Sequence, residues 1–270
     1  MCNFEKFSQC LEIWVIGQNR LLFTCGKGVV SIAKWVLITP HQGLGDHILC
    51  NGLYRVVSAR NKRVFISVKS KYYAELSNML SDCENITLIR IPNYKSWKST
   101  RILQLFARII GVRVVGLGSY GTGFFPKGVR FDNNFYNQAG VQFKERWESF
   151  HVPRNYKKEK EIYDFLGCEK GRYLFLHEDI PRNFIIDRNL LPRDIRVVSP
   201  LSPNKRFNLV DYRLVLEQAF EIHVIESSFA AFIESIPTIN PLIAHRYARP
   251  HALHDFRHEF TYTKKWNVIT

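Results

Sequence analysis

A glycine-rich segment carries the strongest chemical signal in this sequence, His41-Gln42-Gly43-Leu44-Gly45-Asp46-His47. Glycines let the backbone turn sharply and approach a ligand, and a following helix would offer free N–H groups and the positive end of its dipole. We expect Gly43 and Gly45 to contact an anionic ligand. Asp46 at the helix start suits a general base or an ordinary capping residue. A dinucleotide fingerprint fails, because Ile48 occupies the position of its third glycine.

A second polar segment follows a later apolar run, His223-Val224-Ile225-Glu226-Ser227-Ser228. A helix is predicted to begin at once, so serine hydroxyls and N-terminal amides together would form a seat for phosphate. Glu226 is suited to accept hydrogen bonds from ribose hydroxyls. Ser227 or Ser228 is equally a helix N-cap, a role that is compatible with phosphate binding.

A third polar segment is His177-Glu178-Asp179-Ile180-Pro181-Arg182. Polar residues at the carboxyl end of a strand suit ligand contact, and Arg182 is able to hold a phosphate with two parallel hydrogen bonds. The alternative is a turn centred on Pro181 with a surface arginine.

Two further patterns are set aside. Gly116-Leu117-Gly118-Ser119-Tyr120-Gly121 matches a dinucleotide motif by letter, but Pro126 and the glycines around it prevent the helix that the motif needs. We read it as a flexible loop bordering the acceptor site. Near the C-terminus, His251, His254, Asp255 and His258 imitate a metal site, yet neighbouring arginines oppose a cation there. We therefore predict no metal site and no cofactor.

These segments must be positioned by strands that alternate with helices. Strands are predicted at 36–39, 63–68, 86–91, 112–115, 173–177, 195–198, 222–225 and 242–244, and helices near 45–60, 71–82, 96–110, 142–149, 156–166, 210–220 and 228–236. Strands separated by helices predict parallel sheets. The stretch 116–155, which includes the run 131–136, is read as a long connection plus the helix at 142–149.

We therefore expect an α/β protein with two Rossmann-like lobes facing across a cleft. The predicted boundaries are an N-terminal extension at 1–34, a first lobe at 35–155 and a second lobe at 156–270. The extension is open to three interpretations: an extra hairpin, a contact with a membrane surface, or a segment packed on the first lobe.

The composition narrows the class of partner. Thirty-eight Lys and Arg against 24 Asp and Glu give a formal net charge of +14, which favours anionic partners. The six cysteines form no CxxC pair, which favours reduced thiols in the cytoplasm. No apolar run approaches the ~20 residues of a membrane span.

The blocks HQGLGDHILCNGLYR (41–55) and HVIESSFAAFI (223–233) resemble GT-B-fold glycosyltransferases, specifically the heptosyltransferase-like family 9 and its phage and large-virus relatives. In that family, a Gly-Asp pair opens the first helix of the acceptor lobe and its Asp acts as base. The matching residues are Gly45 and Asp46. A strand-to-helix turn and a basic residue bind the donor phosphates, for which Glu226-Ser227-Ser228 and Arg182 are the counterparts.

The resemblance implies an inverting, metal-independent transfer from a nucleotide sugar to a glycan or other hydroxyl acceptor. Asp46 is the expected catalytic base. The expected donor-binding residues are Gly43, Gly45, His177, Asp179, Arg182, Glu226, Ser227 and Ser228, and the expected acceptor-binding residues are His41, His47 and Asn51. The expected location is the cytoplasm, with a peripheral membrane contact open. Two alternatives remain, a basic nucleic-acid-binding protein and an inactive GT-B-like binding module.

Overall fold

The structure is a computed structural model that describes residues 12–16, 20–25, 28–31, 34–41, 43–118, 129–170, 172–201, 206–249 and 261–270. Near the N-terminus, β1 (Glu12–Ile16), β2 (Arg20–Cys25) and β3 (Gly28–Ser31) form an antiparallel three-stranded sheet. Of the three interpretations of residues 1–34, this sheet corresponds to the hairpin.

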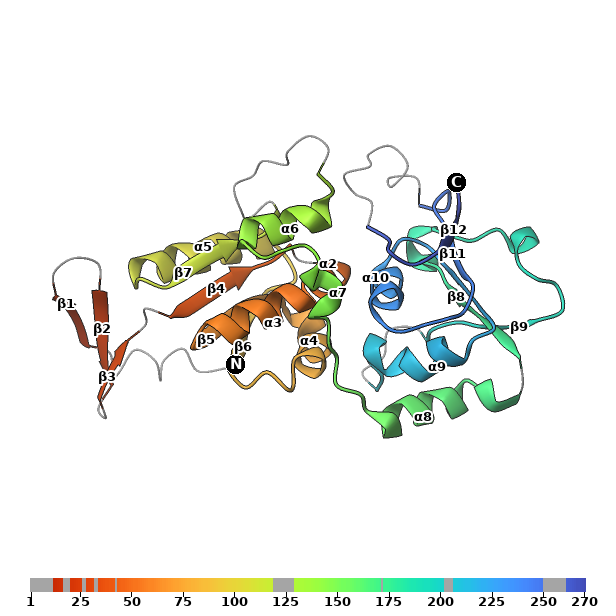
Figure 1. Cartoon of the computed structure of the whole chain (residues 1–270), viewed down its shortest axis with the longest axis horizontal. Coiled ribbons are helices and arrows are strands. Elements are labelled where there is room, and N and C mark those ends of the chain that lie inside the picture. The colour runs from red at the N-terminus through yellow and green to blue at the C-terminus, as the bar shows by residue number, and fades with distance from the viewer. Residues whose placement is uncertain are drawn as a thin grey trace.

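The first lobe is built on a parallel four-stranded sheet in the order β6-β5-β4-β7 (Figure 1). Its strands are β4 (Trp35–Thr39), β5 (Arg63–Lys69), β6 (Ile86–Ile91) and β7 (Arg113–Gly116). Its helices are α2 (Leu44–Leu49), α3 (Asn51–Arg60), α4 (Tyr73–Met79), α5 (Ser96–Ile109), α6 (Phe131–Ala139) and α7 (Glu145–Glu148). The alternation of strands and helices that the sequence predicts up to β7 is confirmed.

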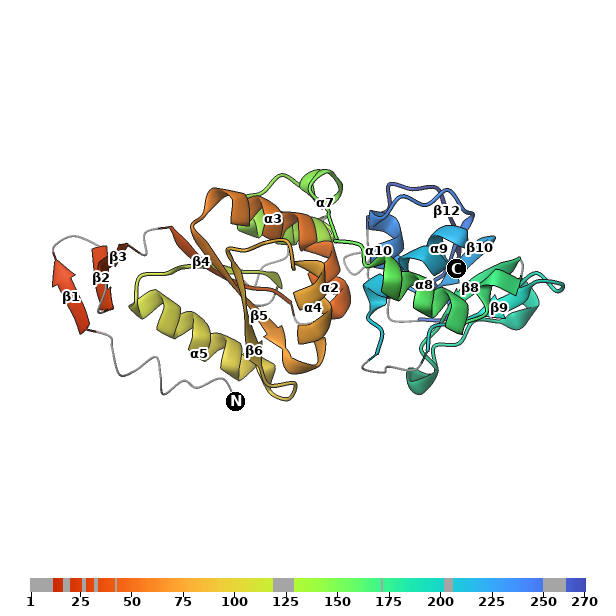
Figure 2. The ribbon, with the colours of Figure 1, turned by 90° about the horizontal axis from the view of Figure 1, so that it is seen from below.

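The two faces of the first sheet are covered unequally. Val36 and Ile38 of β4 pack in one core cluster with apolar residues of α2, α3, α4 and α6. Leu37, on the opposite face, packs with Ala107 of α5 in a smaller cluster. Figure 2 shows α3 and α5 on opposite sides of this sheet. Because side chains alternate between the faces of a strand, β4 is buried on both.

The second lobe holds a parallel five-stranded sheet in the order β12-β11-β10-β8-β9. The strands are β8 (Tyr173–His177), β9 (Arg196–Val198), β10 (Glu221–Val224), β11 (Leu242–His245) and β12 (Trp266–Ile269). The helices are α8 (Tyr156–Phe165), α9 (Arg213–Gln218) and α10 (Ser228–Ser235). Short 3-10 turns of this lobe lie at η3 (Cys168–Lys170), η4 (Ile180–Arg182), η5 (Arg188–Leu190) and η6 (Leu209–Tyr212), and η1 (Ser70–Tyr72) lies in the first lobe. The two sheets fall inside the ranges 35–155 and 156–270, whose boundaries stay a prediction.

The segment between the two sheets differs from its sequence-based interpretation. The run 131–136, read as part of a connection, is most of helix α6. Asp132, Asn134, Phe135 and Tyr136 are all buried in it. Tyr136 receives a hydrogen bond from the amide of Leu53 (3.2 Å) and donates one to the carbonyl of Leu49 (2.9 Å), so tertiary contacts hold this asparagine-rich helix against α2 and α3. Helix propensity alone did not reveal it, because asparagine and aspartate rank low.

Candidate functional site

The first glycine-rich segment lies where the strand order of the first sheet reverses. From β4 the chain runs outward through β5 and β6 and then returns to the other side of β4 as β7. In open α/β sheets, ligands bind outside the carboxyl ends of the strands at such a point. His41 follows β4, and a Cβ placed on Gly118, which follows β7, would lie 3.4 Å from the Cβ of His41. The two strand ends therefore meet at His41.

Asp46 is held in one orientation by two donors. Its Oδ2 accepts from the amide of Gly43 (2.9 Å) and from Nδ1 of His41 (2.8 Å). The bond to Asp46 raises the pKa of His41 above its usual value. A Cβ on Gly43 would approach the Asp46 carboxylate to 2.6 Å, so a side chain at this position would disturb the arrangement. The capping role of Asp46 is real, and its partly exposed carboxylate is also placed at the strand end where a base would be needed.

The second sheet reverses its strand order between β8 and β10. The chain goes from β8 to β9 on one side and then to β10 on the other. His177 ends β8 and Ser227 follows β10, and the Oγ of Ser227 lies 3.1 Å from Nδ1 of His177. The imidazole also packs on Phe229, with 4.5 Å between ring centroids. Burial lowers the pKa of His177 to about 4, so the ring is neutral at pH 7.

Arg182 and Asp179 lie beyond the same end of β8. Their side chains form an ion pair, in which Asp179 is 20% exposed and Arg182 is 66% exposed. The amide of Arg182 also donates to the Asp179 carbonyl (3.0 Å), which closes the turn. The turn that was the alternative interpretation is therefore present. It leaves the guanidinium in solvent beside the strand end that carries His177.

The two segments, one from each lobe, are in direct contact. A Cβ placed on Gly45 would lie 3.6 Å from the Cα and 3.7 Å from the amide nitrogen of Ser228. The start of α2 thus packs against the start of α10, and Figure 1 shows the two helices side by side where the lobes meet. Both helix starts point their N-terminal ends toward strand ends at a topological switch point, which places the predicted catalytic and donor-binding segments in one location.

The effect of a substitution at Gly45 on stability should depend on the size of the new side chain. Gly45→Ala should be neutral or slightly stabilising, because its Cβ would make an ordinary van der Waals contact and alanine is the better helix former. Gly45→Leu should lower the free energy of unfolding by about 1–3 kcal/mol, because the larger side chain must displace the α10 start. Urea unfolding measures both. A leucine variant as stable as the alanine variant would contradict the close approach.

Two predicted acceptor-binding residues are corrected. His47 and Asn51 are both 0% exposed, because they lie one helical turn apart on the inward side of α2 and α3. Nδ1 of His47 lies 3.0 Å from the Tyr54 hydroxyl, and burial lowers the pKa of His47 to about 4. The amide oxygen of Asn51 accepts from the His151 amide at 3.0 Å. Both side chains are part of the core, and His41 is left as the exposed member of the predicted acceptor set.

Glu226 is corrected in the same way. The side chain of Glu226 is 3% exposed and is therefore not open to a ribose. The hydroxyl of Tyr262 donates to its Oε1 at 3.3 Å, and Nε of Arg246 lies 3.7 Å from the same atom. Arg249 donates to the backbone carbonyl of Glu226. The buried carboxylate thus anchors the loops around the α10 start. The sequence around Glu226 does not predict these partners, because they come from later parts of the chain.

Several sequence patterns fall partly or wholly outside the described residues. These are Gln42, the glycine-rich loop from 119 onward, and the histidine-containing segment with His251, His254, Asp255 and His258. The interpretation of residues 119–121 as part of a loop and the expectation that the histidine-containing segment binds no metal therefore stay predictions.

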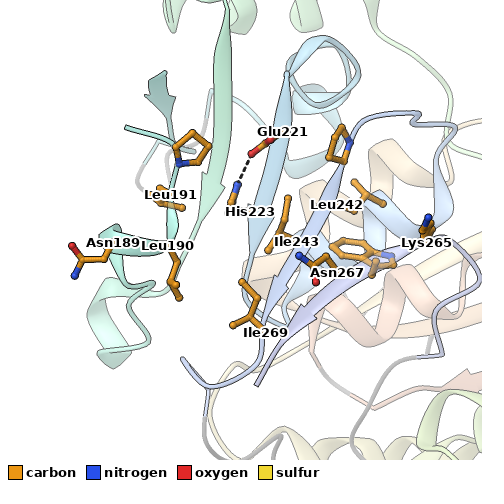
Figure 3. Close-up of a pocket in the computed structure, with 13 residues that line it drawn as sticks. Asn189, Leu190, Leu191, Glu221, His223, Leu242, Ile243, Lys265, Asn267 and Ile269 are labelled. Carbon is orange, nitrogen blue, oxygen red and sulfur yellow. Dashed lines mark hydrogen bonds and ion pairs between the residues drawn. The ribbon is translucent and has the colours of Figure 1, made fainter. Parts of the chain in front are cut away.

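A cavity of about 770 Å³ lies elsewhere in the second lobe (Figure 3). Its lining includes Glu221, His223 and Ile243 from the strands and Leu190 from η5. His223 Nε2 lies 3.1 Å from Glu221 Oε2, and Nδ1 lies 3.0 Å from Nε2 of the buried His245. None of the predicted site residues lines this cavity. His223 begins the segment 223–233, and its imidazole contacts Glu221 and His245.

Comparisons with known proteins bear on the fold. No family model and no curated protein matches the sequence. A family 9 glycosyltransferase from Veillonella parvula is similar in structure, with a TM-score of 0.50, 13% identity and coverage of 78% of this chain and 81% of that one. The ADP-heptose LPS heptosyltransferase II of E. coli has a TM-score of 0.47 and 12% identity, with coverage of 78% of this chain and 84% of that one. An E. coli heptosyltransferase with ADP has a TM-score of 0.40 and 13% identity, with coverage of 78% of this chain and 86% of that one. At these identities, the Veillonella structure shows that this chain has the α/β fold of a family 9 glycosyltransferase.

Proposed function

We propose that this chain is a glycosyltransferase that moves a sugar from a nucleotide sugar to a hydroxyl acceptor. One observation carries the proposal: the segments at the switch points of the two sheets meet at Gly45 and Ser228. Ligands of α/β proteins bind at such points, and a donor and an acceptor that must react need adjoining sites. The fold shared with a family 9 glycosyltransferase agrees with this reading.

The donor diphosphate would lie against the start of α10. The amides of its first turn are free of intrahelical partners, and the hydroxyls of Ser227 and Ser228 add further donors. The exposed guanidinium of Arg182 would exchange part of its pairing with Asp179 for a phosphate oxygen. We propose that these groups, without a metal ion, stabilise the negative charge that develops on the leaving diphosphate.

Asp46 would act as the base on the other side of the reacting centre. Its carboxylate takes the proton of the acceptor hydroxyl as that oxygen attacks the anomeric carbon. The new C–O bond forms while the bond from that carbon to the diphosphate oxygen breaks, and its electron pair leaves with the nucleoside diphosphate. A single displacement of this kind inverts the anomeric configuration. His41, bound to Asp46 and exposed, is placed to contact the acceptor.

A ligand screen tests the proposal directly. We expect one of the UDP-, GDP-, dTDP-, CMP- or ADP-sugars to raise the melting temperature. At a concentration of 100 times its Kd, the ligand should add about 2.7 kcal/mol to the free energy of unfolding. The same nucleotide sugar should then be consumed with an added glycan acceptor. Stabilisation without turnover would instead identify an inactive binding module. Binding only to oligonucleotides, falling steeply with salt, would overturn the proposal in favour of nucleic-acid binding.

A further inference from the structure

Helix α5 packs against the first sheet with the side that carries its small and polar residues. Ser96, Thr100, Gln104 and Ala107 are its buried residues. The Thr100 hydroxyl donates to the Ser96 carbonyl (2.9 Å), and Nε2 of Gln104 donates to Oγ1 of Thr39 at the end of β4 (2.6 Å). Leu103 and Ile110 at the edge add partly buried apolar contacts. The side of α5 that faces the sheet is therefore mainly small and polar, and the hydrogen bond from Gln104 to Thr39 joins the helix to β4.

The opposite side of α5 exposes large apolar residues. We define the outer stripe as Ile102, Leu105, Phe106 and Ile109, which are 69%, 59%, 54% and 65% exposed. Their spacing places them on one face of the helix. This reverses the usual orientation of a surface helix, whose apolar face is turned to the core. An exposed contiguous apolar patch of this kind marks an interaction surface.

The charged residues in the sequence around α5 are all basic. Between residues 85 and 131 the sequence has eight basic residues and no Asp or Glu, and the basic residues are Arg90, Lys95, Lys98, Arg101, Arg108, Arg113, Lys127 and Arg130. Within α5, the helical rotation of about 100° per residue puts Arg101 and Arg108 along one edge of the stripe. Lys98 lies 5.4 Å from the ring of the exposed Trp97. The face combines apolar, aromatic and cationic groups.

We propose that the outer stripe of α5 docks the protein on an anionic phospholipid surface. Helices with Trp, Phe and Leu on one side and Lys and Arg beside them lie flat in the interface, with their apolar side in the acyl boundary. Helix α5 has 14 residues, fewer than the ~20 that a membrane span needs, so it would lie on the membrane surface. Among the helices of the described residues, none has the length and apolarity to cross a bilayer. This proposal concerns a different surface from the transfer site and does not depend on the transfer activity.

A second copy of the chain is a poorer occupant than lipid. Two outer stripes packed on one another by a two-fold axis would bring Lys98, Arg101 and Arg108 of both copies together without any acid in the helix to neutralise them. Anionic headgroups at a lipid surface attract and neutralise these side chains. Charge complementarity therefore selects an anionic lipid surface.

Vesicle co-sedimentation of the full chain tests this proposal. We expect binding to vesicles of phosphatidylcholine with about 30% phosphatidylglycerol, weaker binding as salt rises, and little binding to phosphatidylcholine alone. Leu105→Gln/Phe106→Gln should weaken the binding at least about tenfold. Arg101→Gln/Arg108→Gln should weaken it and reduce its salt dependence. The matched control Phe165→Gln/Ile239→Gln removes exposed apolar residues from the second lobe and should bind like the wild type.

The variants change exposed side chains, and an unchanged melting temperature would show that they fold. Equal binding by the Leu105→Gln/Phe106→Gln variant and the wild type would overturn the proposal, as would equal binding to neutral and anionic vesicles. Sedimentation velocity without vesicles provides a separate check. Self-association that the same double variant abolishes would assign the outer stripe to a second copy and overturn lipid docking.

Discussion

Asp46→Asn is expected to lower the rate of glycosyl transfer by about 10²–10⁴-fold, the range that general base catalysis contributes. Asparagine has nearly the same shape as aspartate, and its amide oxygen still accepts from the Gly43 amide, so the start of α2 should persist. It cannot take the proton of an acceptor hydroxyl. Stabilisation by the nucleotide sugar should remain, because the donor would lie against α10 and Arg182.

The control for this variant is another aspartate with the same capping role. Oδ2 of Asp211 accepts from the amide of Asn208, three residues earlier, at 2.8 Å in η6. Asp211→Asn should leave the kcat of transfer close to the wild-type value, because this residue belongs to no strand end of the site. Initial rates at saturating donor measure both variants. If Asp46→Asn keeps wild-type turnover, Asp46 is only a capping residue.

His41 needs a separate variant because it shares a hydrogen bond with Asp46. If the imidazole were the base and Asp46 only oriented it, His41→Gln would lose as much activity as Asp46→Asn. With Asp46 as the base, we expect His41→Gln to lower the rate about tenfold or less, the effect of losing one hydrogen bond of about 0.5–1.5 kcal/mol. The ratio of the two losses therefore identifies the group that takes the proton.

Arg146→Leu is expected to lower the free energy of unfolding by about 3–5 kcal/mol, the cost of leaving one member of a buried ion pair alone. Arg146 of α7 and Asp132 of α6 form an ion pair in which both side chains are 0% exposed. Asp132 also accepts from the Thr261 amide at 2.8 Å, and Arg146 donates to the Thr261 carbonyl at 2.9 Å. The pair ties the first lobe to the segment that precedes β12.

Denaturant unfolding of single and double variants isolates this interaction. Arg146→Leu/Asp132→Asn should recover part of the lost stability, because the uncompensated charge is also removed. The exposed ion pair between Lys144, the N-cap of α7, and Glu148 supplies the control, and Lys144→Ala should change the free energy of unfolding little. A loss for Arg146→Leu as small as the loss for Lys144→Ala would show that solvent reaches the ion pair.

The sheets were predictable because their signals are local. A short β-branched run such as that of β4 has to be buried, and the glycines and polar residues that follow it mark its end. The same reasoning found every strand from β4 to β11. It missed β12, a short strand that is stabilised by parallel pairing with β11. It also missed α6, whose buried Asp132 is paired with Arg146 and Thr261. A local sequence pattern does not indicate contacts with residues that are distant in the chain.

The site was predictable to the level of segments but not of side chains. Sequence reasoning selected the stretch from His41 to Asn51, and the structure divides it into exposed His41, partly buried Asp46 and fully buried His47 and Asn51. Helical rotation makes this division, since the rotation of about 100° from one residue to the next carries the side chain from the open end of the sheet at Asp46 to the core at His47. Likewise, Glu226 is withdrawn by Tyr262 and Arg246, while Ser227 stays beside His177.

The sequence by itself determined the α/β alternation, the parallel strands and the two polar segments that follow β4 and β10, because apolar periodicity and glycine placement are properties of neighbouring residues. Only the tertiary structure decided that Gly45 meets Ser228 and that α5 turns its apolar side outward. Both outcomes depend on which surfaces remain for packing once the sheets have formed. Which surfaces remain depends on contacts between residues that are distant in the chain, so it can be known only from the complete fold.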